Sequence, residues 1–199
     1  MKTKYLLLIL LYLTACNNKK EIKPSTVSKS AASVFELNSI WHTEENIPIH
    51  LSDLKGKVLV MVMIYTSCKA ACPRLVADMK HIAEKVPSNI REDVNYVLVS
   101  IDPQHDTPER LKKFAIHNQM NAEAWTFLQG TENSVREFAN VLAVKYKEIS
   151  PMDFSHSNII SVFDRQGHLV HQQEGLGVDN QETIEKIIGT ASQHETDND

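Results

Sequence analysis

Two cysteines with three residues between them are the first feature of the chain with chemical meaning. They are Cys68 and Cys72 in the segment YTSCKAACPR, and Pro73 follows directly. Two thiols this close in sequence can form a disulfide, exchange with the disulfide of a partner, or bind a metal ion as thiolates. The spacing is one residue wider than in a Cys-x-x-Cys motif. The loop is therefore wide enough to hold a metal ion and can still close a disulfide.

The segments on either side of the cysteines predict how they are positioned. The apolar run KVLVMVMIYT predicts a strand that is buried on both faces. After the cysteines, apolar residues recur at steps of three and four and predict a helix with one buried face: Leu75, Val76, Met79, Ile82, Ala83 and Val86. VNYVLVSID predicts a second buried strand, and a strand, helix, strand order implies parallel pairing.

Pro73 predicts where the helix begins. A proline disfavours helical geometry at the residue before it and is well tolerated in the first turn, so we expect a helix from Pro73 with Cys72 as its cap. Both sulfurs then lie near a helix N-terminus, where the dipole and free N–H groups stabilise a thiolate and lower the pKa of the thiol. This arrangement therefore predicts that Cys68 and Cys72 are reactive or bind a metal ion. A purely structural disulfide is the alternative.

The remaining segments predict the fold class. FELNSIWHTEENIPIHLSDLKGK reads as a hairpin, and DTPERLKKFAIHNQM as a helix capped by Thr107 with Pro108 at its first position. A strand in AWTFLQG, a helix in ENSVREFANVLAV and a hairpin in SNIISVFDRQGHLVHQQEG follow. The last helix opens with Asp179 and Glu182 in capping-box spacing. This order predicts an α/β, thioredoxin-like fold with an N-terminal β-hairpin and a central mixed sheet flanked by helices.

Two thiolates leave a metal ion short of ligands, and His156 is the best placed of the nine histidines. A long loop after the helix near 132–144 returns the chain to the sheet, and an antiparallel strand starts beyond His156. That point lies beside the carboxyl ends of the parallel strands, where Cys68 and Asp102 also lie. Two thiolates and an imidazole suit Cu(I) and accept Cu(II) with a weak extra ligand, whereas zinc requires a fourth ligand or an open catalytic position. A histidine that binds no metal is the alternative.

The N-terminus predicts export and attachment to a membrane. MKTK, the apolar YLLLILLYL and the small-residue end LTAC form a lipoprotein signal peptide over residues 1–15, with Cys16 as the acylated residue. An ordinary cleaved signal that contains a cysteine is the alternative. Polar residues 16–33 predict a lipid-anchored flexible tether, 34–192 the folded domain, and 193–199 a disordered polar tail. We therefore expect the protein outside the cytoplasm in a bacterial cell envelope, with Cys68 and Cys72 in a compartment that permits disulfides.

Composition limits the classes of protein. The chain has 199 residues, of which 42% are hydrophobic and 23% charged, which suits one globular domain with short appendages. The formal net charge is −4 and the lysines are scattered, so nothing provides the concentrated basic face that nucleic acid binding needs.

Three motifs resemble the Sco/SenC family of membrane-tethered, thioredoxin-fold copper proteins. They are YTSCKAACP, VSIDPQHDTPERL and FSHSNIISVFDRQG, and the resemblance spans about residues 34–190. The resemblance implies that Cys68, Cys72 and His156 bind one copper ion. It also implies a role in assembling the dinuclear copper site of cytochrome c oxidase, either by passing copper to the copper-bearing subunit or by reducing that subunit's cysteines. Its partners would be that subunit and another copper carrier.

The second motif departs from the family at one position. His105 stands where the family commonly has Arg, and could change a partner contact or add a weak metal ligand. Asp102 and Asp106 could orient the metal site or a partner. Equally, Asp102 could simply end a strand in an Asp-Pro turn, and Asp106 could support the helix cap.

Other functions remain open at this point. A thiol-disulfide oxidoreductase would use Cys68 and Cys72 as its catalytic redox pair without an obligatory metal. A peroxide-reducing protein is a weaker alternative, because Thr66 fits but nothing else near the cysteines supplies the Thr and Arg setting of such enzymes. A structural lipoprotein with an incidental disulfide would show neither metal binding nor thiol exchange.

Overall fold

The computed structural model describes residues 33–150 and 153–193. The chain separates into residues 1–30 and residues 31–199, and only the second unit contains described residues. The expected signal peptide, Cys16 and all but one residue of the expected tail lie outside the described ranges, so they stay predictions. Within those ranges, no helix is long and apolar enough to cross a membrane.

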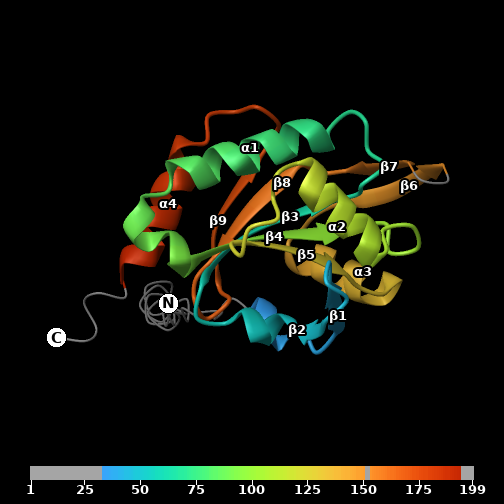
Figure 1. Cartoon of the computed structure of the whole chain (residues 1–199), viewed down its shortest axis with the longest axis horizontal. Coiled ribbons are helices and arrows are strands. Elements are labelled where there is room, and N and C mark those ends of the chain that lie inside the picture. The colour runs from blue at the N-terminus through green and yellow to red at the C-terminus, as the bar shows by residue number, and fades with distance from the viewer. Residues whose placement is uncertain (1–32, 151–152, 194–199) are drawn as a thin grey trace, which may run out of the picture. The chain divides into compact units, whose positions relative to one another are not determined.

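The elements alternate along the chain as the sequence predicts. In order they are η1 (Val34–Glu36), β1 (Ile40–Thr43), β2 (Pro48–His50), η2 (Leu51–Leu54), β3 (Val58–Ile64), α1 (Cys72–Lys85), η3 (Ser88–Asp93), β4 (Val94–Ser100), α2 (Pro108–His117), β5 (Trp125–Gln129), α3 (Glu132–Val141), β6 (Tyr146–Ser150), β7 (Asp153–His156), β8 (Ile159–Phe163), β9 (Leu169–Glu174) and α4 (Gln181–Ser192). Figure 1 shows their arrangement, with the β6–β7 hairpin at the opposite end of the domain from α4.

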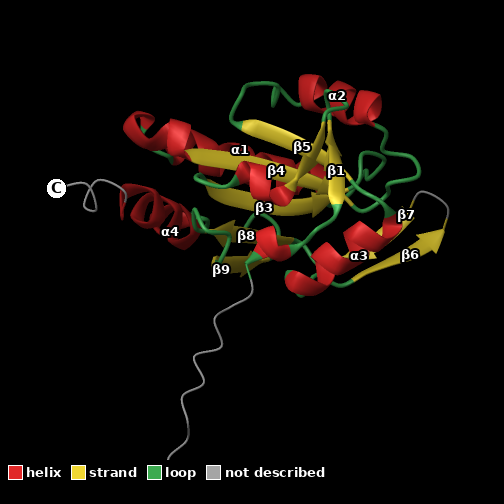
Figure 2. Ribbon diagram, turned by 90° about the horizontal axis from the view of Figure 1, so that it is seen from below, coloured by secondary structure: helices red, strands yellow, loops and turns green. Residues whose placement is uncertain are grey.

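A mixed sheet of seven strands forms the centre of the domain. The order of its strands is β2-β1-β5-β4-β3-β8-β9, and Figure 2 shows β5, β4, β3, β8 and β9 side by side in this order. β3, β4 and β5 are parallel, whereas β8 runs antiparallel to β3 and β1 antiparallel to β5. The carboxyl ends of the parallel strands therefore meet at one edge, and β8 begins beside the end of β3. The α/β, thioredoxin-like fold class with its N-terminal hairpin is confirmed.

Helices cover both faces of the sheet. On β9, His171 and Gln173 hydrogen-bond to Thr183 of α4, whereas Gln172 between them reaches the carbonyl of Leu142 at the end of α3. Because alternate residues of a strand point to opposite faces, α4 and α3 lie on opposite sides of the sheet. Every residue of β3 and β4 is buried.

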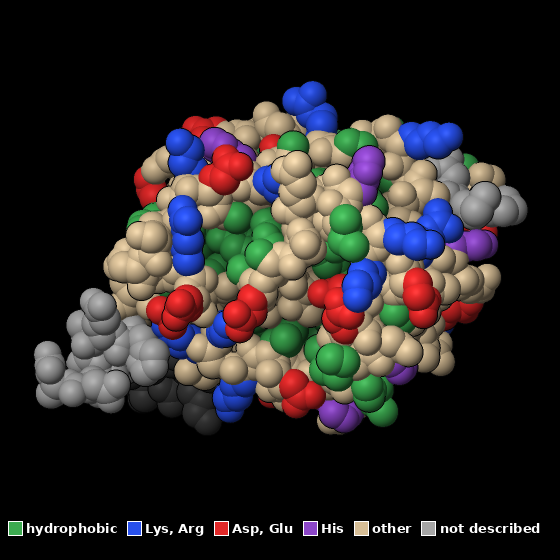
Figure 3. Space-filling model, viewed as in Figure 1, with side chains coloured by type: hydrophobic (Ala, Val, Ile, Leu, Met, Phe, Trp, Pro, Cys, Tyr) green, Lys and Arg blue, Asp and Glu red, His purple; other side chains and the backbone are tan. Residues whose placement is uncertain are grey.

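The molecular surface carries side chains of both charges. On the face in Figure 3, acidic and basic side chains are interspersed, and hydrophobic side chains show between them in several places.

Three local expectations need correction. α1 begins at Cys72, one residue before Pro73, with Ala71 as its N-cap in helical geometry. The α4 N-cap is Asn180, whose side chain accepts from Gln173 and makes no capping hydrogen bond. Asp179 accepts from the backbone N–H of Gln181, and no capping box forms. The expected long loop before residue 156 contains β6 and β7, which pair as a separate two-stranded sheet. The exposed residues of β6 show no apolar periodicity that would have marked a strand.

Candidate functional site: a thiol pair beside a half-buried histidine

The two cysteines lie in the turn between β3 and α1. The backbone N–H of Cys72, at the helix start, donates a hydrogen bond to the sulfur of Cys68 at 3.3 Å. Both residues are free thiols, and Cys68 is partly exposed whereas Cys72 is only 1% exposed. The predicted position at a helix N-terminus is correct, and it places one sulfur at the surface and the other beneath it.

The two thiols differ in acidity. Burial opposes the charge of Cys68, but hydrogen bonds from the backbone N–H groups of Cys72 and Ala70 and from the Tyr65 side chain outweigh it and lower the pKa of the Cys68 thiol. Burial raises the pKa of the Cys72 thiol, and the nearby charges of Cys68 and Asp106 raise it further. The expectation that the helix terminus lowers both pKa values is therefore wrong for Cys72, because desolvation exceeds the effect of the dipole there.

Tyr65 joins the cysteine turn to the hairpin that carries the histidine. Its buried hydroxyl has one proton, which can go to the carbonyl oxygen of Phe154 in β7, 3.2 Å away, or to the sulfur of Cys68. Its ring packs edge-on against Phe154 and against His156, with centroids 5.2 Å and 5.9 Å apart. One aromatic ring thus contacts residues on both sides of the site.

His156 is the last residue of β7, and its ring packs against Tyr65, which follows β3 at the start of the cysteine turn. Its Nδ1 is 3.1 Å from the carbonyl oxygen of Ser157, so that the neutral ring carries its proton there. Its Nε2 is buried and has no hydrogen-bond partner among the described residues. Burial lowers the pKa of His156, although the contact with Ser157 opposes this. A neutral imidazole with a free ring nitrogen is the form that binds metals, and ligating histidines commonly donate their other N–H to a carbonyl.

The residues present fit a soft metal ion, although they do not form a closed site. Within residues 33–150 and 153–193, no group of three His, Cys, Asp or Glu side chains is close enough together to hold a metal. Cys68 and Cys72 adjoin each other, and His156 reaches them only through the ring of Tyr65. The donor set is still that of a copper ligand sphere, with two sulfurs and one unpartnered imidazole nitrogen.

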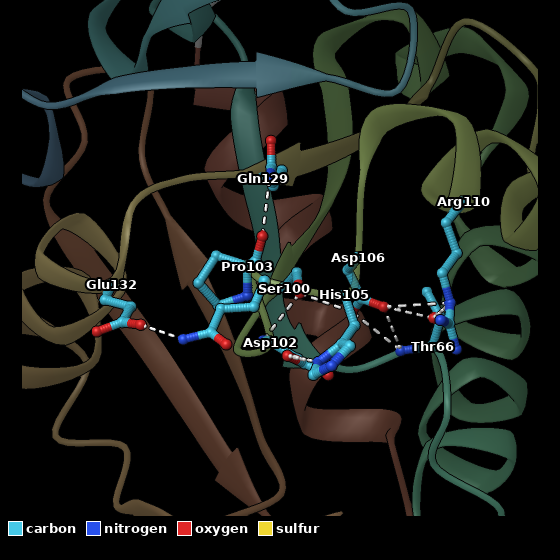
Figure 4. A network of polar contacts seen from close by, with 10 residues as sticks. Thr66, Ser100, Asp102, Pro103, His105, Asp106, Arg110, Gln129 and Glu132 are labelled. Atoms are coloured by element: carbon cyan, nitrogen blue, oxygen red, sulfur yellow. Dashed lines mark hydrogen bonds and ion pairs between the residues drawn. The ribbon is translucent and has the colours of Figure 1, made fainter. Parts of the chain in front are cut away.

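Asp106 anchors the residue that opens the cysteine turn (Figure 4). Its side chain is fully buried and accepts hydrogen bonds from the backbone N–H of Thr66 at 3.1 Å, from the Thr66 hydroxyl, and from Ser100 at 2.7 Å. Arg110, on the first turn of α2, donates to the Thr66 hydroxyl at 2.7 Å and lies 3.7 Å from Asp106. Burial raises the pKa of Asp106, against the effect of the hydrogen bonds from Ser100 and Thr66. Asp106 thus supports the turn and does not act only at the α2 cap.

Asp102 lies at the end of β4 and pairs with His105. The Nδ1 of His105 is 2.8 Å from Oδ1 of Asp102, and the backbone N–H of Asp102 donates to the Ser100 hydroxyl. Asp102 is 3% exposed, and its Oδ2 has no hydrogen-bond partner among the described residues. The turn that follows β4 therefore holds a carboxylate with one paired oxygen and one unpaired oxygen.

Three contributors to the site escaped the sequence analysis. Tyr65 falls at the end of the strand that the sequence predicts, and an aromatic residue with a hydroxyl three positions before Cys68 is the available signal. Arg110 is four residues after Asp106 on a predicted helix, which is the spacing of a facing ion pair. Arg110 also donates to the hydroxyl of Thr66. This contact corrects the expectation that no arginine accompanies Thr66 near the cysteines, as it would in a peroxide-reducing protein. Phe154 belongs to the β6–β7 hairpin, where the sequence predicts a loop.

Comparison with known proteins identifies the family. The SCO1/SenC family model matches residues 28–192. The SCO1 protein homolog of Bacillus subtilis is 30% identical over 141 residues, which are 66% of this chain and 65% of that protein. This chain therefore spans just under two thirds of the length of that relative.

Solved structures show the same fold. A structure of Arabidopsis thaliana ScoI with copper bound superposes with a TM-score of 0.67 at 18% identity, and covers 78% of this chain and 96% of that one. A structure of BsSco, described as a member of the Sco family of cytochrome c oxidase assembly proteins with a disulfide switch, superposes with a TM-score of 0.66 at 22% identity, and covers 77% and 91%. With a family model that matches residues 28–192, and with this fold around Cys68 and Cys72, the chain belongs to the SCO1/SenC family.

Proposed function

We propose that the protein binds one copper ion through Cys68, Cys72 and His156 and delivers it during assembly of the dinuclear copper site of cytochrome c oxidase. The observation that carries this proposal is the buried, unpartnered Nε2 of His156, whose ring packs on Tyr65, the residue that also hydrogen-bonds to the free thiol of Cys68. A copper ion would satisfy that nitrogen, and two sulfurs with one imidazole suit Cu(I). Membership of the SCO1/SenC family and the copper bound in Arabidopsis ScoI support the choice of metal.

Binding requires the histidine to approach the sulfurs. His156 belongs to the small β6–β7 sheet, which is separate from the central sheet, so a shift of this hairpin brings Nε2 toward Cys68 without breaking the central ladder. The copper is then cargo that the protein releases to a partner, and an incompletely preformed site suits exchange better than permanent storage. The oxidase partner is proposed from the family and from the description of BsSco. The lipid anchor on Cys16 would hold the domain at the membrane where an oxidase is assembled.

Copper binding to the reduced protein tests the proposal. We expect one equivalent of Cu(I) to bind, and Cu(II) to give sulfur-to-copper charge-transfer absorption. His156→Ala is expected to weaken binding at least tenfold, and Cys68→Ser or Cys72→Ser to abolish the charge-transfer band. His168→Ala is the matched control, since His168 lies on the β8–β9 turn and pairs with Asp164. Copper binding by His156→Ala with the affinity of the wild type would contradict the proposed ligand set.

One observation favours a second function, thiol-disulfide exchange. Cys68 is partly exposed with a lowered pKa, whereas Cys72 is buried with a raised pKa. An exposed thiolate that attacks a partner disulfide and a buried thiol that then resolves the mixed disulfide have this asymmetry. The two functions are separable, because exchange with a model disulfide requires both cysteines but is unaffected by His156→Ala.

A further inference from the structure

A cavity of about 530 Å³ shares one lining residue, Phe154, with the contacts of Tyr65 at the thiol site. It lies between the turn after β4, one side of α3 along its length, and the β6–β7 hairpin. This volume is within the range of about 300–1,000 Å³ that small-ligand sites occupy. The cavity is also at the carboxyl end of a parallel strand, where open α/β sheets commonly bind ligands. No part of the proposed copper chemistry uses it.

The inner wall of the cavity is apolar except for one carboxylate. Ile101, Val135, Ala139 and Val144 line it and are buried, and Asp102 lines it at 3% exposure. One oxygen of Asp102 is paired with His105, but Oδ2 has no partner among the described residues. A buried carboxylate oxygen without a hydrogen-bond donor costs free energy. Because Oδ2 is shielded from solvent, the carboxylate must turn toward the cavity for a ligand to donate to it, and such a ligand then gains that free energy on binding.

His105 adds a second acceptor beside Asp102. In the neutral ring, Nδ1–H donates to Asp102, which leaves Nε2 with a lone pair on a side chain that is 40% exposed and lines the cavity. A carboxylate oxygen and an imidazole nitrogen side by side are two acceptors, so a cation with more than one N–H donor can hydrogen-bond to both. A guanidinium has this planar fork, whereas an ammonium ion is a point charge that prefers to stay hydrated.

The rest of the lining suits an arginine side chain. The apolar wall can pack along an alkyl stem, and Tyr146 and Phe154 supply aromatic rings on which a guanidinium can stack. The rim is mixed in charge, with Arg136, Lys145 and Lys147 opposed by Glu132 and Glu148. Basic groups at the rim fit the carboxylate or carbonyl groups at the other end of such a ligand.

We propose that this cavity binds a guanidinium group, carried either by free arginine or by an arginine residue of a polypeptide. The charged head meets Asp102 and His105, and the stem lies along α3. Phe154 belongs both to the cavity and to the contact with Tyr65, so a polypeptide arginine seated there lies beside the cysteine turn. The inference is independent of the copper proposal, because it needs neither the cysteines nor a metal ion.

Calorimetric titration of the full-length, metal-free protein tests the inference with three probes. L-Arginine represents the free ligand, Nα-acetyl-L-arginine amide represents an arginine residue within a polypeptide, and L-citrulline has the same length without the charge. We expect saturable binding of an arginine probe, at least tenfold tighter than that of citrulline. Tighter binding of Nα-acetyl-L-arginine amide than of L-arginine indicates a polypeptide source, and tighter binding of L-arginine indicates a small molecule. Absence of binding, or equal binding of citrulline, would overturn the inference.

Two variants and a control locate the binding. Asp102→Asn keeps the shape of the side chain and removes its charge, and we expect at least a tenfold loss of affinity. His105→Ala removes the second acceptor, with an expected loss of several-fold. His168→Ala is the control, because it removes a histidine from a second Asp–His pair, Asp164–His168, that does not line this cavity. If Asp102→Asn fails to fold, His105→Ala decides the question, since unchanged arginine affinity in that variant would refute the site.

Discussion

Asp106 holds Thr66 across 40 positions of sequence, through both the backbone N–H and the hydroxyl of the threonine. This contact ties the start of the cysteine turn to the beginning of α2. The turn between β3 and α1 is therefore fixed by a buried carboxylate from a different part of the chain, and its geometry depends on that carboxylate.

Asp106→Ala is expected to destabilise the protein strongly. The variant leaves the Thr66 N–H and the Ser100 hydroxyl without their acceptor, and hydrogen bonds to a charged group contribute about 1.5–3 kcal/mol each. We expect the free energy of unfolding to fall by about 3 kcal/mol or more, measured by chemical denaturation. Asp53→Ala is a suitable control, because Asp53 makes a comparable backbone contact with His50 at the exposed β2 end. Equal effects of the two substitutions would contradict the buried role of Asp106.

The pH dependence of stability reports the raised pKa of Asp106. Because burial raises the pKa in the folded state above the ordinary aspartate value of about 3.9, the folded state binds the proton more tightly than the unfolded state. This contribution to stability is fully present below pH 3.9 and is lost as the pH rises through the folded-state pKa. We therefore expect the unfolding free energy of the wild type, relative to Asp106→Asn, to decrease with rising pH over that interval. A difference that is constant or increases with pH would show that the pKa is not raised.

Alkylation should distinguish the two cysteines in the reduced, metal-free protein. Cys68 is partly exposed and its pKa is lowered. Its thiolate therefore forms at a lower pH than the thiolate of an ordinary cysteine, whose pKa is about 8.5. Cys72 is buried and its pKa is raised, so it should react slowly throughout. Mass spectrometry after timed iodoacetamide treatment measures both rates, with Cys68→Ser and Cys72→Ser assigning the sites. Faster modification of Cys72 would contradict the structure.

Tyr65→Phe tests the link between the cysteine turn and the hairpin. The variant keeps the ring that packs on His156 and removes the hydroxyl that donates to Phe154. We expect a loss of about 1 kcal/mol in unfolding free energy and an upward shift in the pH at which Cys68 is alkylated, because a hydrogen bond that lowers its pKa is lost. Tyr146→Phe on the adjacent β6 is the control. An unchanged alkylation profile would show that the hydroxyl does not act on Cys68.

A pair of glycine substitutions tests the packing of the N-terminal hairpin. A Cβ at Gly130 would lie 2.6 Å from the ring of Trp41, which is fully buried against Phe138, so Gly130→Ala should destabilise by about 1–3 kcal/mol. A Cβ at Gly189 meets nothing within 4 Å inside helix α4. Gly189→Ala should therefore stabilise by up to about 1 kcal/mol through helix propensity. Thermal unfolding measures both, and a stabilising Gly130→Ala would contradict the close contact with Trp41.

The sequence by itself determined the order of the elements except for the β6–β7 hairpin, and it determined the position of the cysteines. The apolar runs that became β3 and β4, the periodic residues of α1 and the Thr107–Pro108 start of α2 are local signals that survive folding, so the parallel sheet and the cysteine turn at its edge were predictable. Strand topology even placed His156 near that edge. These features depend on neighbours in sequence or on general rules of connection.

Only the tertiary structure decided the properties of the site. Whether Cys72 is acidic depends on how deeply the core buries it, and burial outweighs the helix terminus there. The Tyr65 contact with Phe154 and the Asp106 contact with Thr66 join residues 89 and 40 positions apart. The unpaired oxygen of Asp102 exists because no donor from another element reaches it. Such contacts arise from packing between distant segments, which no local pattern in the sequence records.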